Sequence, residues 1–140
     1  MFCRELAVQV HREREAIRAT GAELVFVGNG NTAFARAFVE DYAIDAPLYV
    51  DPSRRTYQAL GMRRPGVLAF FLSPRLLAAV ARALRGGFMQ GPIRGDALQL
   101  GGVLVVGRGG ELAFRHVAED AGDHPDVGEL VRAAGRARAA

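Results

Sequence analysis

Apolar positions recur first at helical spacing and then in short continuous runs, and this alternation predicts the secondary structure. Leu6, Val10 and Ile17 are separated by charged residues and followed by Gly21, which is typical of an amphipathic helix with a glycine stop. The next run, "ELVFVG" at 23–28, predicts a short buried strand. One apolar face within "NTAFARAFVEDY", at 31–42, then predicts a second helix.

The remaining two thirds of the chain continues the alternation. Asp51 and Pro52 form an N-cap and a first-turn proline for a helix that we expect to end at Gly61. The other predicted elements are a strand at 47–51, a helix at 73–85, a hairpin of strands at 102–107 and 111–116, and a last helix from 126 to about 137. This order predicts an α/β fold with the final strand pair antiparallel at one edge of the sheet.

Composition narrows the class of protein. The 140 residues suffice for one domain, and the net charge of +3 comes from arginines interleaved with acidic residues. With no basic run and few aromatic residues, we expect no nucleic-acid partner. Cys3 is the one cysteine, so an internal disulfide is excluded, and the longest apolar stretch is too short to cross a bilayer. We therefore expect a reducing, cytoplasmic setting and no membrane partner.

Four sequence blocks resemble one family. They are "FCRE" at 2–5, "VDPSRRTYQALGM" at 50–62, "GGF" at 86–88 and "LGGVLVVGRGGELAFRHVAEDAGD" at 100–123. They are similar to the peroxiredoxin-like 2 group of the alkyl hydroperoxide reductase and thiol-specific antioxidant superfamily. The resemblance implies a single thioredoxin-like domain over 1–140, with a mixed sheet flanked by helices and an extra helix at about 73–85.

The resemblance also implies a missing piece. Relatives carry CxxC followed by Arg-Glu after an apolar strand; Cys3 matches the second cysteine, and the first would precede Met1. That first strand is central in thioredoxin-like folds, between the strands matching 24–27 and 103–106. We therefore expect the domain to be N-terminally incomplete, with Met1 an internal methionine. The alternative is a shortened protein whose sheet closes in another way, such as by forming a homodimer.

Cys3 is the candidate catalytic residue. A helix N-terminus has unpaired N–H groups and a positive dipole end, which favour a thiolate, and Arg4 and Glu5 would shape the local field. The resemblance implies thiol-dependent reduction of a peroxide or related oxidised substrate without a cofactor. Because no second cysteine can resolve a sulfenic acid, an external thiol of the thioredoxin or glutathione type would be the reductant. The Thr-x-x-Cys context and the matching arginine near Gly101 are absent, so the alternative is a non-catalytic thioredoxin-like binding module.

Two further patterns suggest other sites. "GNGNTA" at 28–33 follows a strand and opens a helix, as in a dinucleotide-binding turn, with Asp51 in place of a ribose-binding acid. The competing interpretation is a tight turn in which Asn29 and Asn31 adopt unusual dihedral angles. A cluster in the acidic loop has metal-ligating residue types but no recognised spacing, so we expect no metal there; its members are His116, Glu119, Asp120, Asp123 and His124. His11, on a charged helix, is expected to be solvated.

Overall fold

The computed structural model describes residues 2–66, 85, 96, 98–120 and 123–139, and every structural statement below concerns these residues. The helix expected at 73–85 and the "GGF" block lie outside them, apart from Arg85. The described elements alternate as expected for an α/β chain. They are α1 (Phe2–Arg12), α2 (Arg14–Ala19), β1 (Phe26–Gly28), α3 (Thr32–Tyr42), β2 (Leu48–Val50), α4 (Arg55–Ala59), β3 (Gly102–Val106), β4 (Leu112–Val117) and α7 (Val127–Ala139).

The first predicted helix is present as two segments, α1 and α2. The helix is interrupted at Glu13, whose backbone dihedral angles of φ −92° and ψ 11° are not helical. The stop at Gly21 is confirmed: this residue has φ 83°, in the left-handed region where a side chain would be strained. The chain can therefore turn back from α2 towards β1.

β1, α3 and β2 form a strand–helix–strand unit. The two strands are parallel, with Phe26 opposite Leu48 and Gly28 opposite Val50. Asn31 begins α3 as its N-cap, because its side-chain oxygen accepts a hydrogen bond from the Phe34 N–H at 3.0 Å. The two predicted strands and the helix are confirmed here. Each strand is shorter than the run of residues from which it was predicted.

The predicted hairpin and the final helix are also confirmed. β3 and β4 are antiparallel, and the turn between them places Gly110 at φ 87°. The register shifts between Val105 and Val106, so β4 has one extra residue at a bulge. α7 follows and contacts both strands of this hairpin.

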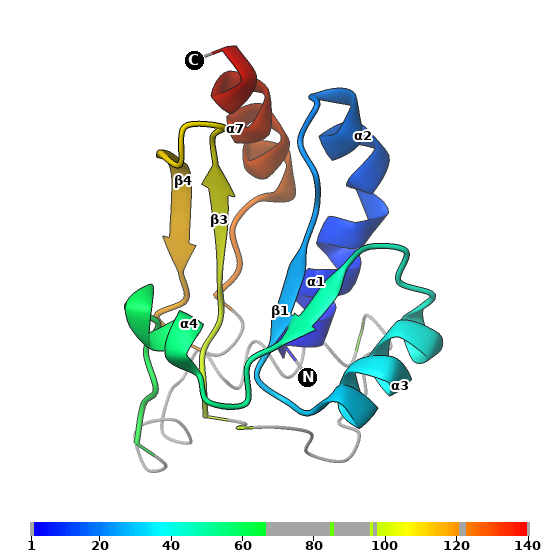
Figure 1. Ribbon diagram of the computed structural model, residues 1–140, viewed down its shortest axis with the longest axis vertical. Coiled ribbons are helices and arrows are strands. Elements are labelled where there is room, and N and C mark those ends of the chain that lie inside the picture. The colour runs from blue at the N-terminus through cyan, green and yellow to red at the C-terminus, as the bar shows by residue number, and fades with distance from the viewer. Residues whose placement is uncertain (1, 67–84, 86–95, 97, 121–122, 140) are drawn as a thin grey trace.

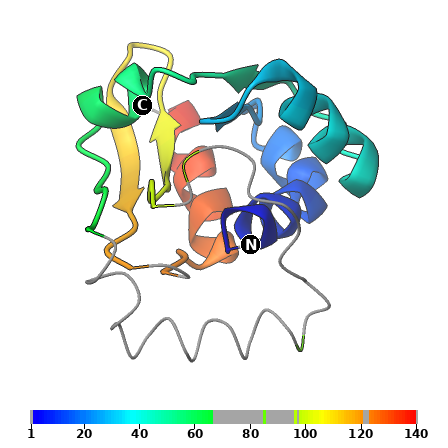
Figure 2. The same ribbon diagram turned by 90° about the horizontal axis from the view of Figure 1, so that it is seen from below.

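The strands lie in a layer between helices. Figures 1 and 2 show α1, α2 and α7 on one side of the strands, with α3 and α4 towards the other side. The described strands form two separate two-stranded sheets, β1–β2 and β3–β4, instead of the one sheet expected from the sequence. The α/β fold class is confirmed, and it is consistent with a thioredoxin-like fold. The expected central strand between the sheets stays a prediction.

The free edges of these two sheets face each other in Figure 1. The Phe26 N–H donates to Pro47 O, so the backbone groups of Phe26 point towards β2. Successive residues of a strand point to opposite edges, and the backbone groups of Val27 therefore point away from β2. The Ala118 N–H donates to Gly101 O, so the backbone groups of Gly101 point towards the β4 side. Every second residue of an antiparallel strand points this way, and the backbone groups of Leu104, three residues later, therefore point away from β4. Within the described chain, no strand pairs with either of these edges.

The core lies between the helices of one layer and the strands. Its buried centre is Val10 from α1, Ile17 from α2 and Leu130 from α7. Partly buried apolar residues from the strands and helices pack around this centre: Leu6, Ala22, Leu24, Val103, Phe114, Val127 and Val131. The core thus joins both sheets through a shared set of helices. Among the described helices, none is long and apolar enough to span a bilayer.

Candidate functional site

One end of the molecule gathers the elements that could form a site. β1 and β2 both terminate at the end where α1 begins, as the ribbon in Figure 1 shows, and the loops that follow these strands lead into α3 and α4. Figure 2, which views the molecule from this end, has the N-terminus of α1 near its centre. Ligands in α/β proteins commonly bind at the carboxyl ends of parallel strands. The candidate site is therefore at this end.

Cys3, Arg4 and Glu5 all lie in the first turn of α1, as the sequence predicted. Glu5 is only 3% exposed, and its Oε1 accepts a hydrogen bond of 3.4 Å from Gln9 Nε2. An acidic residue in the first turn also complements the helix dipole. The structure thus gives Glu5 a buried position, and the chemical role of Cys3 stays a prediction from the sequence.

A charged cluster that the sequence analysis did not identify lies at the same end. Arg54 Nη1 and Arg64 Nε both contact Asp96 Oδ2, Arg64 at 2.6 Å, and the Leu98 N–H donates to Asp96 Oδ1 at 3.1 Å. Desolvation acts to raise the pKa of Asp96. The hydrogen bonds from Arg64 and Leu98 and the charges of both arginines outweigh this effect, so the pKa is lowered. The carboxylate is thus ionised at neutral pH and holds two guanidinium groups together.

The backbone of Arg54 supports a special role for this residue. It has φ 59°, in the left-handed region, although it is not glycine. Such a conformation costs about 1 kcal/mol and is found preferentially at functional sites. The signal in the sequence was the pair of Arg-Arg dipeptides at 54–55, where α4 begins, and at 63–64, after α4 ends.

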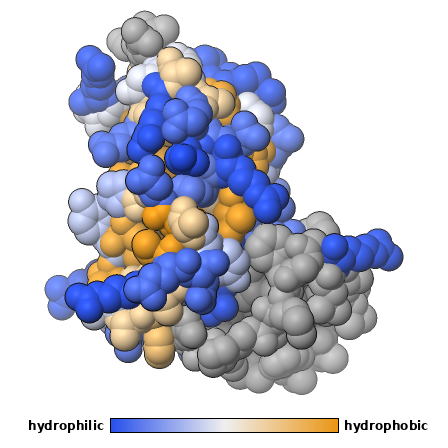
Figure 3. Space-filling model, turned by 90° about the vertical axis from the view of Figure 1, so that its right-hand side faces the viewer, coloured by the Kyte–Doolittle hydropathy of each residue, from blue (hydrophilic) through white to orange (hydrophobic). Residues whose placement is uncertain are grey.

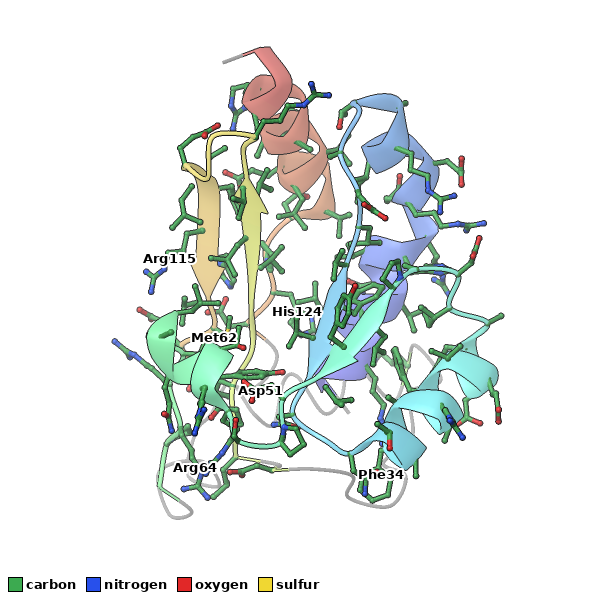
Figure 4. All side chains as sticks on the ribbon, in the orientation of Figure 1. Phe34, Asp51, Met62, Arg64, Arg115 and His124 are labelled. Carbon is green, nitrogen blue, oxygen red and sulfur yellow. The ribbon has the colours of Figure 1, made fainter. Side chains whose placement is uncertain are left out.

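Asp51 orders the loop that carries Arg54. Its carboxylate accepts hydrogen bonds from the Ser53 hydroxyl at 2.6 Å and from the Thr56 N–H at 2.7 Å. The Ser53 bond most strongly, and the Thr56 bond after it, lower the pKa of Asp51 to about 2, although desolvation acts in the opposite direction. The prediction of Asp51 as the N-cap is wrong, because the N-cap is Arg54 and α4 begins at Arg55, three residues later than a proline in the first turn would require. Asp51 binds the Thr56 N–H of α4 from outside the cap position. Figure 4 shows Asp51, Met62 and Arg64 around α4.

The "GNGNTA" turn has a structural role in the described geometry. Asn31 caps α3, and Asn29 Nδ2 donates to the backbone oxygen of Asp96 at 3.0 Å. Neither asparagine has a positive φ, so the expectation of unusual dihedral angles at these residues is wrong. Both side chains act through their hydrogen bonds instead. Asn29 thereby ties the end of β1 to the charged cluster.

His11 is the one histidine whose environment differs from the expectation. It was expected to be solvated, but it is 8% exposed, and its Nε2 accepts a hydrogen bond of 2.9 Å from the Asp45 N–H. Desolvation most strongly, followed by the charge of Arg14, lowers its pKa. The helical charge pattern was misleading because the loop between α3 and β2 folds over this position. His11 thus joins α1 to the strand–helix–strand unit in its neutral form.

We expect this histidine to make the fold less stable in mild acid. Because the folded-state pKa lies below the ordinary value, the unfolded chain binds the proton more readily, and stability falls as the pH drops below about 6.5. The protonated ring also loses its acceptor for Asp45. The melting temperature should fall by a few degrees between pH 7.5 and 5.5, on the order of one kcal/mol for a chain of this size. A His11→Gln variant should show a flatter profile; equal slopes for both proteins would contradict this assignment.

The acidic loop before α7 does not form a metal-binding group in the described residues. His116 Nε2 lies 3.4 Å from Asp123 Oδ1, and Asp123 Oδ2 accepts a hydrogen bond from the Glu119 N–H at 2.9 Å. These contacts connect β4 to the segment that leads into α7. His116 and Asp123 therefore hold the loop between β4 and α7 in place.

The family is decided by comparison with known proteins. The model of a family described as AhpC/TSA antioxidant enzyme matches residues 9–120, which is most of the chain. This chain belongs to the AhpC/TSA antioxidant enzyme family. The family assignment made from "FCRE", "GGF" and the two longer blocks is thereby confirmed.

Curated relatives agree with this family membership. The chain is 34% identical to prostamide/prostaglandin F synthase of Aquarana catesbeiana, with 96% of this chain and 68% of the relative aligned. It is 30% identical to the protein of the same name in Bos taurus, again with 96% and 68% aligned. The chloroplastic thioredoxin-like protein AAED1 of Arabidopsis thaliana is 28% identical, over 95% of this chain and 56% of that protein. A thioredoxin-like antioxidant family with oxidoreductase-type members is therefore the framework for the function.

Proposed function

We propose that this AhpC/TSA family chain is a thiol-dependent redox protein that reduces a peroxide or a related oxidised substrate through Cys3. The observation that carries the proposal is the position of Cys3 in the first turn of α1, at the end of the molecule where β1 and β2 terminate. Unpaired N–H groups and the positive end of the helix dipole favour the thiolate at such a position. The match to a family described as AhpC/TSA antioxidant enzyme and the relatives named prostamide/prostaglandin F synthase support a redox activity.

The chemistry begins with attack of the Cys3 thiolate on one peroxide oxygen. The oxygen–oxygen bond breaks, the sulfur is oxidised to a sulfenic acid, and the departing alkoxide takes a proton to become an alcohol. Two electrons thus pass from sulfur to the peroxide. Arg4 and the buried Glu5 influence the field of the first turn.

Cys3 is the one cysteine of the given sequence, so we propose that the second thiol comes from another molecule. A first external thiol condenses with the sulfenic acid, forms a mixed disulfide and releases water. A second thiolate attacks the external sulfur of this disulfide, which restores the Cys3 thiolate and releases an oxidised dithiol or disulfide. Thioredoxin-type and glutathione-type thiols both supply these two electrons. We propose such a reductant as the partner of this chain in a reducing compartment.

The proposal is tested by trapping the sulfenic acid. We expect dimedone to label Cys3 after the protein is treated with stoichiometric cumene hydroperoxide. If excess dithiothreitol is added after the hydroperoxide and before dimedone, the labelling should be lost. Peptide mass spectrometry locates the adduct. If the thiol stays unmodified and the hydroperoxide is not consumed, the chain is a non-catalytic thioredoxin-like binding module instead.

A further inference from the structure

The strand–helix–strand unit presents an apolar surface to solvent. Val25, in the extended segment before β1, and Val27 are both 44% exposed, and Tyr49, opposite Val27 on β2, is 64% exposed. Alternation along the strands and the parallel register place these three side chains on one side of the sheet, away from the core residue Leu24. Figure 3 shows hydrophobic surface gathered at the height of β1 and β2, with hydrophilic residues above and below it. We call the surface of Val25, Val27 and Tyr49 the outer face.

One end of the outer face carries acidic residues. Glu23 is exposed and lies two positions before Val25, so the same alternation places it on this side of the sheet. Asp45 lies four positions before Tyr49, at the corresponding end of β2, and its side chain is 76% exposed. Its Oδ2 is 4.0 Å from Arg14 Nε, so this charge is only weakly compensated. The amino end of the two strands is therefore negative.

The opposite end of the outer face is basic. The Tyr57 hydroxyl donates to Val27 O at 2.8 Å, which fixes α4 beside the carboxyl end of β1. Arg55, the first residue of α4, is exposed. Four arginines outnumber two carboxylates around this helix: Arg54, Arg55, Arg63 and Arg64, against Asp51 and Asp96. Because two of the arginines share the one carboxylate of Asp96, this end keeps an excess of positive charge.

This order of charges makes the outer face complementary to itself. Two identical faces can meet about a two-fold axis that lies in the interface and runs across the strands, and the strands of the two copies then point in opposite directions. The apolar centres meet, and the acidic end of each copy lies over the basic end of the other. The same contact is made twice, as in every isologous dimer. Opposite charges favour this orientation, whereas the orientation that brings like charges together is disfavoured.

We propose that the outer face is the interface of a homodimer, with Val27 and Tyr49 at its centre and Glu23 of each copy close to Arg55 of the other. The proposal does not depend on the chemistry of Cys3. A standard interface takes about 800 Å² from each partner, which is about a tenth of the accessible surface of 8540 Å². A single two-stranded face lies at the low end of interface sizes, so the association is reversible and depends on concentration.

Sedimentation velocity of the full chain tests the dimer at protein concentrations from about 1 to about 200 μM. Dithiothreitol must be present, because a disulfide between two Cys3 thiols would give a dimer of another kind. We expect the mass to rise with concentration towards twice that of the chain. Tyr49→Asp should weaken the association about ten-fold or more, because it places a charge in the apolar centre on both sides of the interface. Leu112→Asp is the matched control: Leu112 is 53% exposed on β4, in the other sheet, and this variant should associate as the unmodified chain does.

Exchange of the charges tests the orientation of the two copies. Glu23→Arg and Arg55→Glu should each weaken the association about ten-fold, because each substitution acts at both symmetry-related contacts. The double variant Glu23→Arg/Arg55→Glu should restore it to within a few-fold of the unmodified chain. All substituted positions are exposed, and circular dichroism checks that each variant keeps its fold. A chain that stays monomeric at every concentration, equal losses in Tyr49→Asp and Leu112→Asp, or a double variant no better than the single ones would overturn the proposal.

Discussion

Replacing Cys3 with serine will reduce the consumption of cumene hydroperoxide by this protein to the uncatalysed rate. The serine hydroxyl has nearly the shape of the thiol, but it stays protonated at neutral pH and is not oxidised by peroxide. The first turn of α1 is otherwise retained, with Glu5 still buried and bonded to Gln9. The loss of activity can be measured as peroxide consumed per protein in the presence of glutathione or a thioredoxin system.

Glu5→Gln serves as the control for this experiment. It keeps the size of the side chain and a hydrogen-bonding oxygen for Gln9. We expect this variant to retain peroxide consumption within a few-fold of the unmodified protein. Peroxide consumption that is equal with Cys3 and with serine would show that the activity resides elsewhere.

Replacing Leu130 with alanine will have the largest effect on stability. Leu130 is 4% exposed and meets Val10 and Ile17 at the point where α7 contacts α1 and α2. Truncation of a buried leucine costs about 2–5 kcal/mol, through lost apolar burial and the cavity that remains. The free energy of unfolding of a domain is typically about 5–15 kcal/mol, so this substitution should remove a large part of it. Urea unfolding followed by circular dichroism measures the change.

Arg132→Ala provides the comparison on the same helix. Its ion pair with Asp126 has an N–O distance of 3.7 Å, and both side chains are about two thirds exposed or more. Exposed ion pairs contribute about 0–1 kcal/mol, so the free energy of unfolding should hardly change. Similar losses from Leu130→Ala and Arg132→Ala would show that the buried cluster does not hold α7 in place.

The sequence predicted the elements well wherever local patterning decides the structure. The glycine stop at Gly21 and the hairpin of β3 and β4 each follow from side-chain or backbone preferences within a few residues. The pairing of the strands was less predictable. Apolar runs identify strands but not their neighbours. The described strands form two pairs, and a central strand between them was expected only from the family resemblance.

Long-range contacts explain what the sequence did not predict about the site. Arg54 and Asp96 are 42 positions apart, and Arg64 and Asp96 are 32 apart, so no local motif joins them. His11 and Asp45 are separated by 34 positions, and the helical charge pattern of α1 contains no sign that a loop covers this histidine. The first turn around Cys3 was predictable because a helix start depends on neighbouring residues alone.

The pH dependence of Cys3 alkylation tests the central claim most directly. The rate of iodoacetamide labelling follows the thiolate fraction, and the helix N-terminus should give an apparent pKa below the ordinary cysteine value of about 8.5. We predict a midpoint between about 7 and 8, since dipole effects of up to ~2 kcal/mol correspond to ~1.5 pH units. A midpoint at or above about 8.5 would contradict the activated thiol and the redox function built on it.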